Sequence, residues 1–180
     1  MTQHTPSNEM VHVSDLIDEI LSTHHENTRR WMKSIQTEFD VLAETQGKNS
    51  KLQRLETAFR GLKMTMQGHM EKEEMILFPA CRALERGEDG GSHCGGIENP
   101  IRVMHMEHEE LEQYVMQIRE ITKNFTVDSG EEGLVKKLYK PLEELVTDIK
   151  VHAGKEEERL FPAAIALEKK LQGGCCGCNC

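Results

Sequence analysis

Apolar residues recur every three or four positions along four long segments of this chain, the spacing that places them on one face of a helix. In the first segment, this face contains Leu16, Ile17, Ile20, Leu21, Trp31, Ile35 and Leu42. Asn99 and Pro100 are typical of a helix start, and Gly173 and Gly174 of a helix end. The predicted helices cover about residues 14–45, 50–85, 100–125 and 129–172.

The order of these segments predicts an all-α protein, an up-down-up-down four-helix bundle of residues 14–172. Residues 1–13 are mostly polar, and we expect a flexible N-terminal arm. Residues 173–180 are expected to form a flexible cysteine-rich tail. A loop between the second and third helices is predicted by the run GEDGGSHCGG.

An internal repeat is the most informative pattern in the chain. One copy, HMEKEEMILFPACRALE, starts at His69, and the other, HAGKEEERLFPAAIALE, starts at His152. The copies lie 83 residues apart and share His, Lys, two Glu, Leu-Phe-Pro and a final Glu. Because the same offset places His25 on His108, the chain is interpreted as two repeated helical hairpins.

The spacing of the histidines places them at one height in the bundle. In each hairpin, one histidine lies 22 residues before and another 22 residues after a glycine, Gly47 or Gly130. Residues equidistant from an antiparallel turn lie side by side, here roughly 33 Å from the turn at 1.5 Å per residue. The predicted layer contains His25, His69, His108 and His152.

Two glutamates complete a candidate metal site. Glu73 and Glu156 each follow a histidine by four residues, which places both groups on one helix face. One such pair is usually a surface pair, but two in a repeat with two further histidines favour a metal site. Four imidazoles and two carboxylates suit iron or manganese better than calcium, and offer no thiolate for structural zinc. Shared between two metals, they give each two nitrogens and two oxygens.

At these residues the sequence resembles the hemerythrin-like superfamily, over about residues 14–171. In HMxKEExxLFP and in VMxxEH at 103–108 it looks most like the di-iron domain of repair-of-iron-centres proteins. The resemblance implies two iron ions with an oxo or hydroxo bridge, the four histidines as ligands, and Glu73 and Glu156 as bridges. It also implies a link to nitrosative and oxidative stress and to recovery of damaged iron–sulfur clusters.

The sequence departs from that family in two ways. The repair proteins carry a fifth histidine late in the first helix, and that place falls here at Glu44-Thr45. Either one iron has an extra open position, or Glu44 serves as a ligand. The family's usual N-terminal cysteine-bearing domain is not found here, and a cysteine-rich tail follows the bundle instead.

Further residues are candidates for contacts with the ligands. His105 is either a spare ligand or channel residue or an exposed side chain, and Glu107 either a proton-relay carboxylate or a solvated charge. Tyr114 either reaches the site or packs in the core. Glu74 and Glu157, which follow the bridging glutamates, either accept hydrogen bonds from ligand imidazoles or form surface ion pairs.

Two further expectations concern local geometry. His24 lies about 100° around the helix from His25, and we expect it to be exposed. Each Leu-Phe-Pro places a proline inside a helical pattern, which predicts a kink or break near Leu77 and Leu160. The end of the core is expected to be closed by Leu77, Phe78, Leu160 and Phe161.

Charge and composition exclude several function classes. A formal net charge of -9 gives the chain no overall attraction for nucleic acid. No apolar run approaches the roughly 20 residues that span a bilayer, and no secretory signal is evident, so we expect a cytoplasmic location. Four of the six cysteines crowd the tail, as Cys175, Cys176, Cys178 and Cys180, and are candidates for a secondary soft-metal or redox site.

Three functions compete at this point. The first is a di-iron protein that binds or reacts with O2, NO or peroxide, in stress defence or iron–sulfur cluster repair. The second is a storage or delivery module that passes metal to an iron–sulfur or other metal-acceptor protein through the tail. The third is a helical bundle without metal. The residues leave open whether the protein turns over a substrate, and its oligomeric state.

Overall fold

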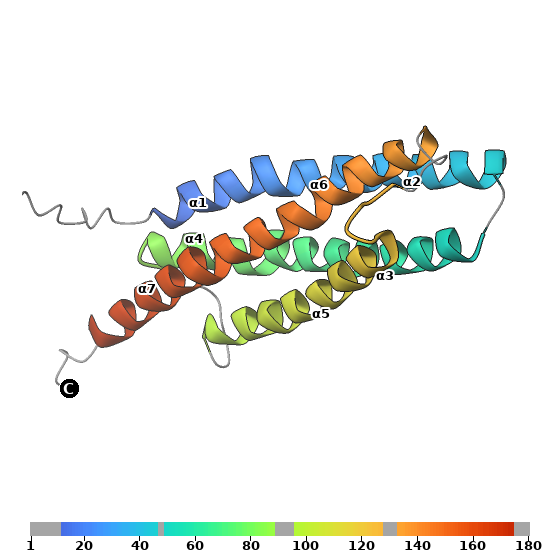
Figure 1. The fold of residues 1–180 in the computed structure, drawn as a ribbon. Helices are drawn as coiled ribbons and strands as arrows, with labels where there is room; N and C mark the ends of the chain where they lie inside the picture. Colours follow the sequence, from blue (N-terminus) through green and yellow to red (C-terminus); the bar gives the residue numbers. More distant parts are fainter. Residues whose placement is uncertain (1–11, 47–48, 89–95, 128–132, 175–180) are drawn as a thin grey trace, which may run out of the picture.

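The computed structural model describes residues 12–46, 49–88, 96–127 and 133–174. Four helical rods lie side by side and alternate in direction, so the predicted all-α four-helix bundle is confirmed (Figure 1). The most extensive contacts join α2 with α6 and α3 with α5. The elements are α1 (Val13–Glu19), η1 (Ile20–His25), α2 (Glu26–Gln46), α3 (Ser50–Lys72), η2 (Glu73–Leu77), α4 (Phe78–Glu85), α5 (Glu98–Thr122), α6 (Leu134–Lys155), η3 (Glu156–Leu160) and α7 (Phe161–Gly174).

The observed boundaries differ from the predicted ones by a few residues. The first rod begins at Val13, and α7 extends to Gly174. Helix α5 begins at Glu98, so Asn99 and Pro100 lie within its first turn and do not mark its start. The predicted turn glycines 47 and 130, the N-terminal arm before residue 12 and the tail cysteines lie outside the described residues.

The rods do not break at the two Leu-Phe-Pro segments, because a π-helical turn precedes each proline and the helix continues. A kink at these positions, the other expectation, stays a prediction. The turns η2 and η3 end at Leu77 and Leu160, and helical backbone angles continue through the next residue. A proline ring clashes with the carbonyl four residues earlier in an α-helix, and it has no N–H to donate. A wider turn changes that spacing and lets the helix pass the proline.

The final glutamate of each repeat closes the start of the first helix in its own hairpin. Glu85 accepts hydrogen bonds from the backbone N–H groups of Val13 and Ser14, at 2.6 and 2.9 Å, and from the Ser14 hydroxyl. Glu168, 83 residues later, accepts one from the backbone N–H of Ile97 at 2.9 Å. Carboxylates at these positions satisfy free N–H groups and complement the helix dipole.

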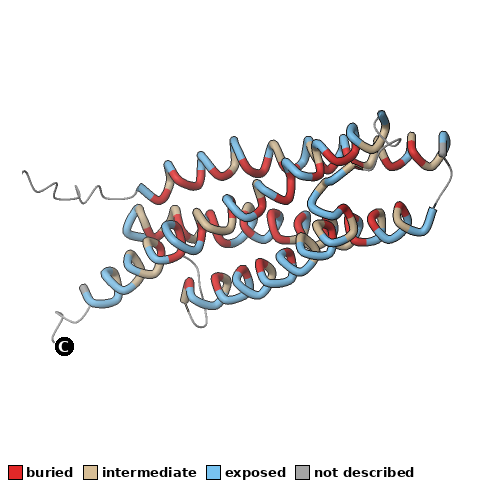
Figure 2. The backbone as a smooth tube through the Cα atoms, viewed as in Figure 1, coloured by how far each residue is buried: buried red, intermediate tan, exposed pale blue. Residues whose placement is uncertain are grey.

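The interior consists of two apolar clusters with a polar layer between them. Figure 2 shows buried residues along the inward faces of all four rods. The hairpin-side cluster lies between α2, α3, α5 and α6 and includes Phe39, Phe59, Leu62, Leu111 and Leu142. The terminal-side cluster includes Ile17, Leu77, Phe78, Leu160 and Phe161. Phe78 and Phe161 lie beside the polar layer, with ring centroids 5.7 Å from His25 and 6.1 Å from His108, so closure of the core's end by the Leu-Phe residues stays a prediction. Helices of the described segments are too short or too polar to cross a membrane.

Candidate metal centre

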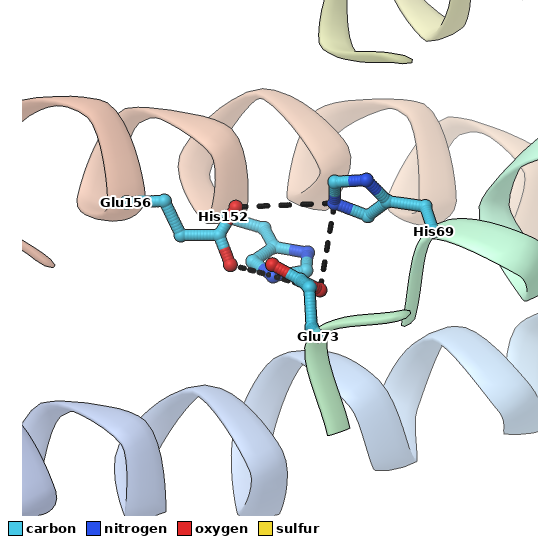
Figure 3. A group of neighbouring side chains, drawn as sticks. All are labelled: His69, Glu73, His152 and Glu156. Carbon is cyan, nitrogen blue, oxygen red and sulfur yellow. Dashed lines mark hydrogen bonds and ion pairs between the residues drawn. The ribbon is translucent and has the colours of Figure 1, made fainter. Parts of the chain in front are cut away.

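The polar layer between the two clusters brings together all six residues of the predicted ligand set. Each side chain is at most 8% exposed, and His108 is the most exposed. Figure 3 shows four of them, from α3, η2, α6 and η3, pointing toward one another. The layer contains His25, His69, Glu73, His108, His152 and Glu156.

The imidazoles form two pairs, each made by helices that pack closely. His69 from α3 and His108 from α5 place their Nε2 atoms 3.3 Å apart. His25 from η1 and His152 from α6 have ring centroids 5.0 Å apart. Each pair therefore joins the two hairpins, and neither hairpin alone supplies a complete pair.

The two carboxylates lie between the imidazole pairs. Glu156 places Oε1 2.8 Å from Nε2 of His152 and Oε2 3.0 Å from Nε2 of His108. Glu73 places Oε2 3.2 Å from Nε2 of His25 and 3.4 Å from Nε2 of His69. Each carboxylate thus contacts one imidazole of each pair, the arrangement of a bridge between two metal positions.

A metal ion accounts for polar atoms that the protein leaves without partners. Both carboxylate oxygens of Glu73, Oε2 of Glu156 and Nε2 of His25 are buried without a hydrogen-bond partner among the described residues. Each buried polar group without a partner lowers the free energy of unfolding by about 1–3 kcal/mol. Ligands that bind a metal at about 2.1 Å and at right angles lie about 3.0 Å apart. The close nitrogen–oxygen distances at Glu73 and Glu156 fit that separation.

Carboxylates outside the layer hold three of the four imidazoles through the other ring nitrogen. Nδ1 of His25 lies 2.6 Å from Glu74, and Nδ1 of His108 lies 2.9 Å from Glu157. Nδ1 of His69 lies 3.2 Å from Glu107. A proton held on Nδ1 leaves the lone pair of Nε2 directed inward, which is the tautomer that a metal ligand requires.

The pKa values of the imidazoles in the layer are shifted in different directions. Burial lowers the pKa of His25, but its contacts with Glu73 and Glu74 outweigh burial and raise that pKa. The pKa of His108 is raised in the same way, because its contacts with Glu156 and Glu157 outweigh burial. Burial and neighbouring imidazoles lower the pKa of His152 to about 3. This imidazole is therefore neutral, as a metal ligand must be.

The bridging carboxylates also differ from each other. Burial raises the pKa of Glu73, and the nearby charge of Glu156 raises it further. Burial opposes ionisation of Glu156 as well, but contact with His108 outweighs it and lowers that pKa. A divalent or trivalent cation between the two groups would favour the ionised form of both.

Comparison with known proteins agrees with this arrangement. The Hemerythrin HHE cation-binding domain matches residues 16–164. The chain belongs to the hemerythrin family. The expected resemblance to the hemerythrin-like superfamily is therefore confirmed.

Relatives of this hemerythrin domain include iron–sulfur cluster repair proteins. The chain is 38% identical to the repair protein YtfE of Edwardsiella ictaluri over 104 residues, covering 58% of this chain and 43% of the relative. It is 29% identical to YtfE of Yersinia pseudotuberculosis over 157 residues, covering 87% and 67%. For YtfE of Salmonella typhimurium the identity is 29% over 159 residues, covering 88% and 69%.

One buried histidine of this hemerythrin-family layer was missed. The expectation that His24 is exposed is wrong, because its side chain is 3% exposed. Its ring stacks on His152 with centroids 5.3 Å apart, and its Nδ1 lies 2.9 Å from Asp148. The π-helical turn η1 ends at His25 and changes the helical rotation, and α6 covers this face. The direct adjacency of His24 to His25 was the feature of the sequence that could have indicated a second buried histidine here.

The remaining candidates lie around or away from the hemerythrin-family site. The structure rules out Glu44 as a ligand, because it is exposed, 19 residues after His25 and about 28 Å along the rod. Tyr114 packs over Gly61 and the hairpin-side cluster. His105 is exposed, with Nδ1 3.4 Å from Glu157.

Proposed function

We propose that the protein binds two iron ions, one between His25 and His152 and the other between His69 and His108. Glu73 and Glu156 bridge the two positions in this proposal. The observation that supports it is the pair of buried carboxylates, each in contact with both imidazole pairs, whose oxygens include several without hydrogen-bond partners.

The donor set is compatible with iron. Imidazole and carboxylate together suit iron or manganese, and the layer offers none of the thiolates that are common in structural zinc sites. Among the described residues the cysteine is Cys81, which lies in the terminal-side cluster and not in the layer. Burial raises the pKa of its thiol to about 12, so it supplies no thiolate.

The side chains around the layer suit a centre that receives a small molecule. Iron, when bound, supplies a Lewis acid that can change its oxidation state. Six donors shared between two ions leave fewer than six protein ligands for each. The apolar clusters on both sides exclude water, and His108 lies nearest the surface. We therefore propose O2, NO or peroxide as the ligand class.

The context that the relatives support is repair or defence under oxidative or nitrosative stress. The curated relatives are named iron–sulfur cluster repair proteins. We propose this role for the present chain as an extension of its metal site. The alternative, metal storage or delivery through Cys175–Cys180, stays a prediction because those residues lie outside the described ones.

Metal analysis of the purified protein tests the proposal. We expect about two irons per chain, and a loss of iron in His69→Ala and His152→Ala. The matched control is His12→Ala, because His12 is an exposed histidine just before α1 and lies outside the polar layer. Absorption spectra recorded with O2, NO and peroxide in turn should change for the parent and the control alone. A protein that binds fewer than two irons would contradict the proposal.

A further inference from the structure

The two halves of the layer differ at two pairs of equivalent positions. The 83-residue offset that relates the ligands places His24 on Glu107 and Asp148 on Thr65. His24 directly precedes His25, and Glu107 directly precedes His108, both ligands in the proposed site. His24 and Glu107 each contact the opposite hairpin. The repeat therefore predicts the same contact twice, but the residues are not the same.

In one half, the contact is a carboxylate on an imidazole. Glu107 from α5 lies 3.2 Å from Nδ1 of His69 and also pairs with Lys72. The other member of this imidazole pair, His108, has Glu157 on its Nδ1. Both imidazoles of this half are thus fixed by carboxylates.

In the other half, a second imidazole takes the place of the carboxylate. The rings of His24 and His152 are parallel within 4°, so neither donates an in-plane hydrogen bond to the other. The Asp148 carboxylate, within 3.0 Å, is engaged by His24. No carboxylate of the described residues contacts Nδ1 of His152, and Nε2 of His24 is buried without a partner.

This difference bears on how strongly each metal is held. A carboxylate on the far nitrogen fixes the orientation of a ligand imidazole and makes it a better donor, and its loss typically lowers metal affinity about 10–100-fold. The His69/His108 position has two such carboxylates, and the His25/His152 position has one, Glu74. We propose that His24 makes the two positions unequal, so that the metal between His25 and His152 leaves first. This inference rests on the proposed two-metal centre.

Exchange of the equivalent residues tests the inference directly. The double variant His24→Glu/Asp148→Thr gives His152 the environment of His69, and Glu107→His/Thr65→Asp does the reverse. The full-length parent and both variants are loaded with two equivalents of Fe(II) without oxygen, and transfer to the coloured chelator ferrozine is followed. The parent should release one iron in a fast phase and one in a slow phase.

The first variant should slow the fast phase by about tenfold or more, and the second should accelerate the slow phase to match the fast one. The variant His152→Ala should keep the slow phase alone. Circular dichroism and melting temperature establish folding, and if one double variant does not fold, the other decides.

Three results would overturn the inference. They are a single release rate for both irons of the parent, unchanged phases in a folded double variant, or a His152→Ala protein that keeps the fast phase. A parent that holds fewer than two irons would overturn the proposed function, and this inference with it.

Discussion

The buried carboxylate of Glu73 should stabilise the metal-loaded protein and destabilise the metal-free one. Both of its oxygens are buried without a hydrogen-bond partner in the part of the chain that the structure describes, and burial and the charge of Glu156 raise its pKa. Glu73→Gln keeps the shape of the side chain, removes the charge and supplies an amide that can donate to Glu156. We expect this variant to be more stable than the parent without metal and less stable with it.

The magnitudes follow from the cost of partnerless groups and from linkage. Removing a buried unsatisfied carboxylate should stabilise the metal-free protein by about 1–3 kcal/mol. Free metal at a hundred times the dissociation constant stabilises the parent by about 2.7 kcal/mol, and the variant gains less because it lacks a bridge. A raised carboxyl pKa lowers stability as the pH rises above its ordinary value, so the advantage of metal-free Glu73→Gln should grow with pH.

Urea unfolding measures both effects. The parent and Glu73→Gln are compared with a chelator and with excess Fe(II) in the absence of oxygen. Glu71→Gln is the matched control, since Glu71 is an exposed residue of α3, two positions before Glu73. A metal-free Glu73→Gln protein less stable than the parent would refute the reasoning, as would equal stabilisation of both by iron.

Three other substitutions test the scaffold by urea unfolding. Glu85→Ala should lower the free energy of unfolding by about 1–2 kcal/mol, because α1 loses its cap. Burial opposes ionisation of Glu85, but hydrogen bonds from α1 outweigh it and lower its pKa, so this loss should shrink as the pH falls through that lowered value. Gly61→Ala should cost about 1–3 kcal/mol without changing iron content, because the added Cβ lies 2.3 Å from the Tyr114 ring. Asn124→Gly should add roughly 0.5–1 kcal/mol, since its φ is 52°.

Each of these substitutions has a control or an opposing outcome. Glu88→Ala should be nearly neutral, because Glu88 is exposed and pairs with Arg86 at the surface. Gly68→Ala should be neutral or stabilising, since apart from the adjacent residues and the backbone of its own helix no atom lies within 4 Å of the added Cβ. Equal stability of the Gly61 and Gly68 variants would contradict the packing argument. A destabilised Asn124→Gly protein would contradict the strain argument.

The repeat revealed the bundle and brought the six candidate ligands to one layer because helical rise is regular over long distances. Spacing alone places His25 beside His69, and an 83-residue offset supplies the second hairpin. These inferences need no knowledge of side-chain contacts. They hold wherever the backbone follows the standard helix.

The sequence reading failed where the backbone departs from that helix. His24 was placed on the exposed face by assuming a constant 100° rotation, and the turn η1 alters that rotation. A break was one of two outcomes expected at Leu77 and Leu160, and it does not occur because a π-helical turn precedes each proline. Long-range contacts, such as that of Glu85 with the start of α1, depend on packing that no local pattern specifies.

The polar layer separates two apolar clusters, and we expect each cluster to set the local stability of its own part of the molecule. Apolar contacts within the hairpin-side and terminal-side clusters are continuous, but between them lie imidazoles and carboxylates that repel or lack partners when no cation is bound. Amide hydrogen exchange in metal-free protein should therefore show α1, α4 and α7 opening separately from the hairpin-side half. Two bound ions would join the halves, so that protection of both rises to the same value.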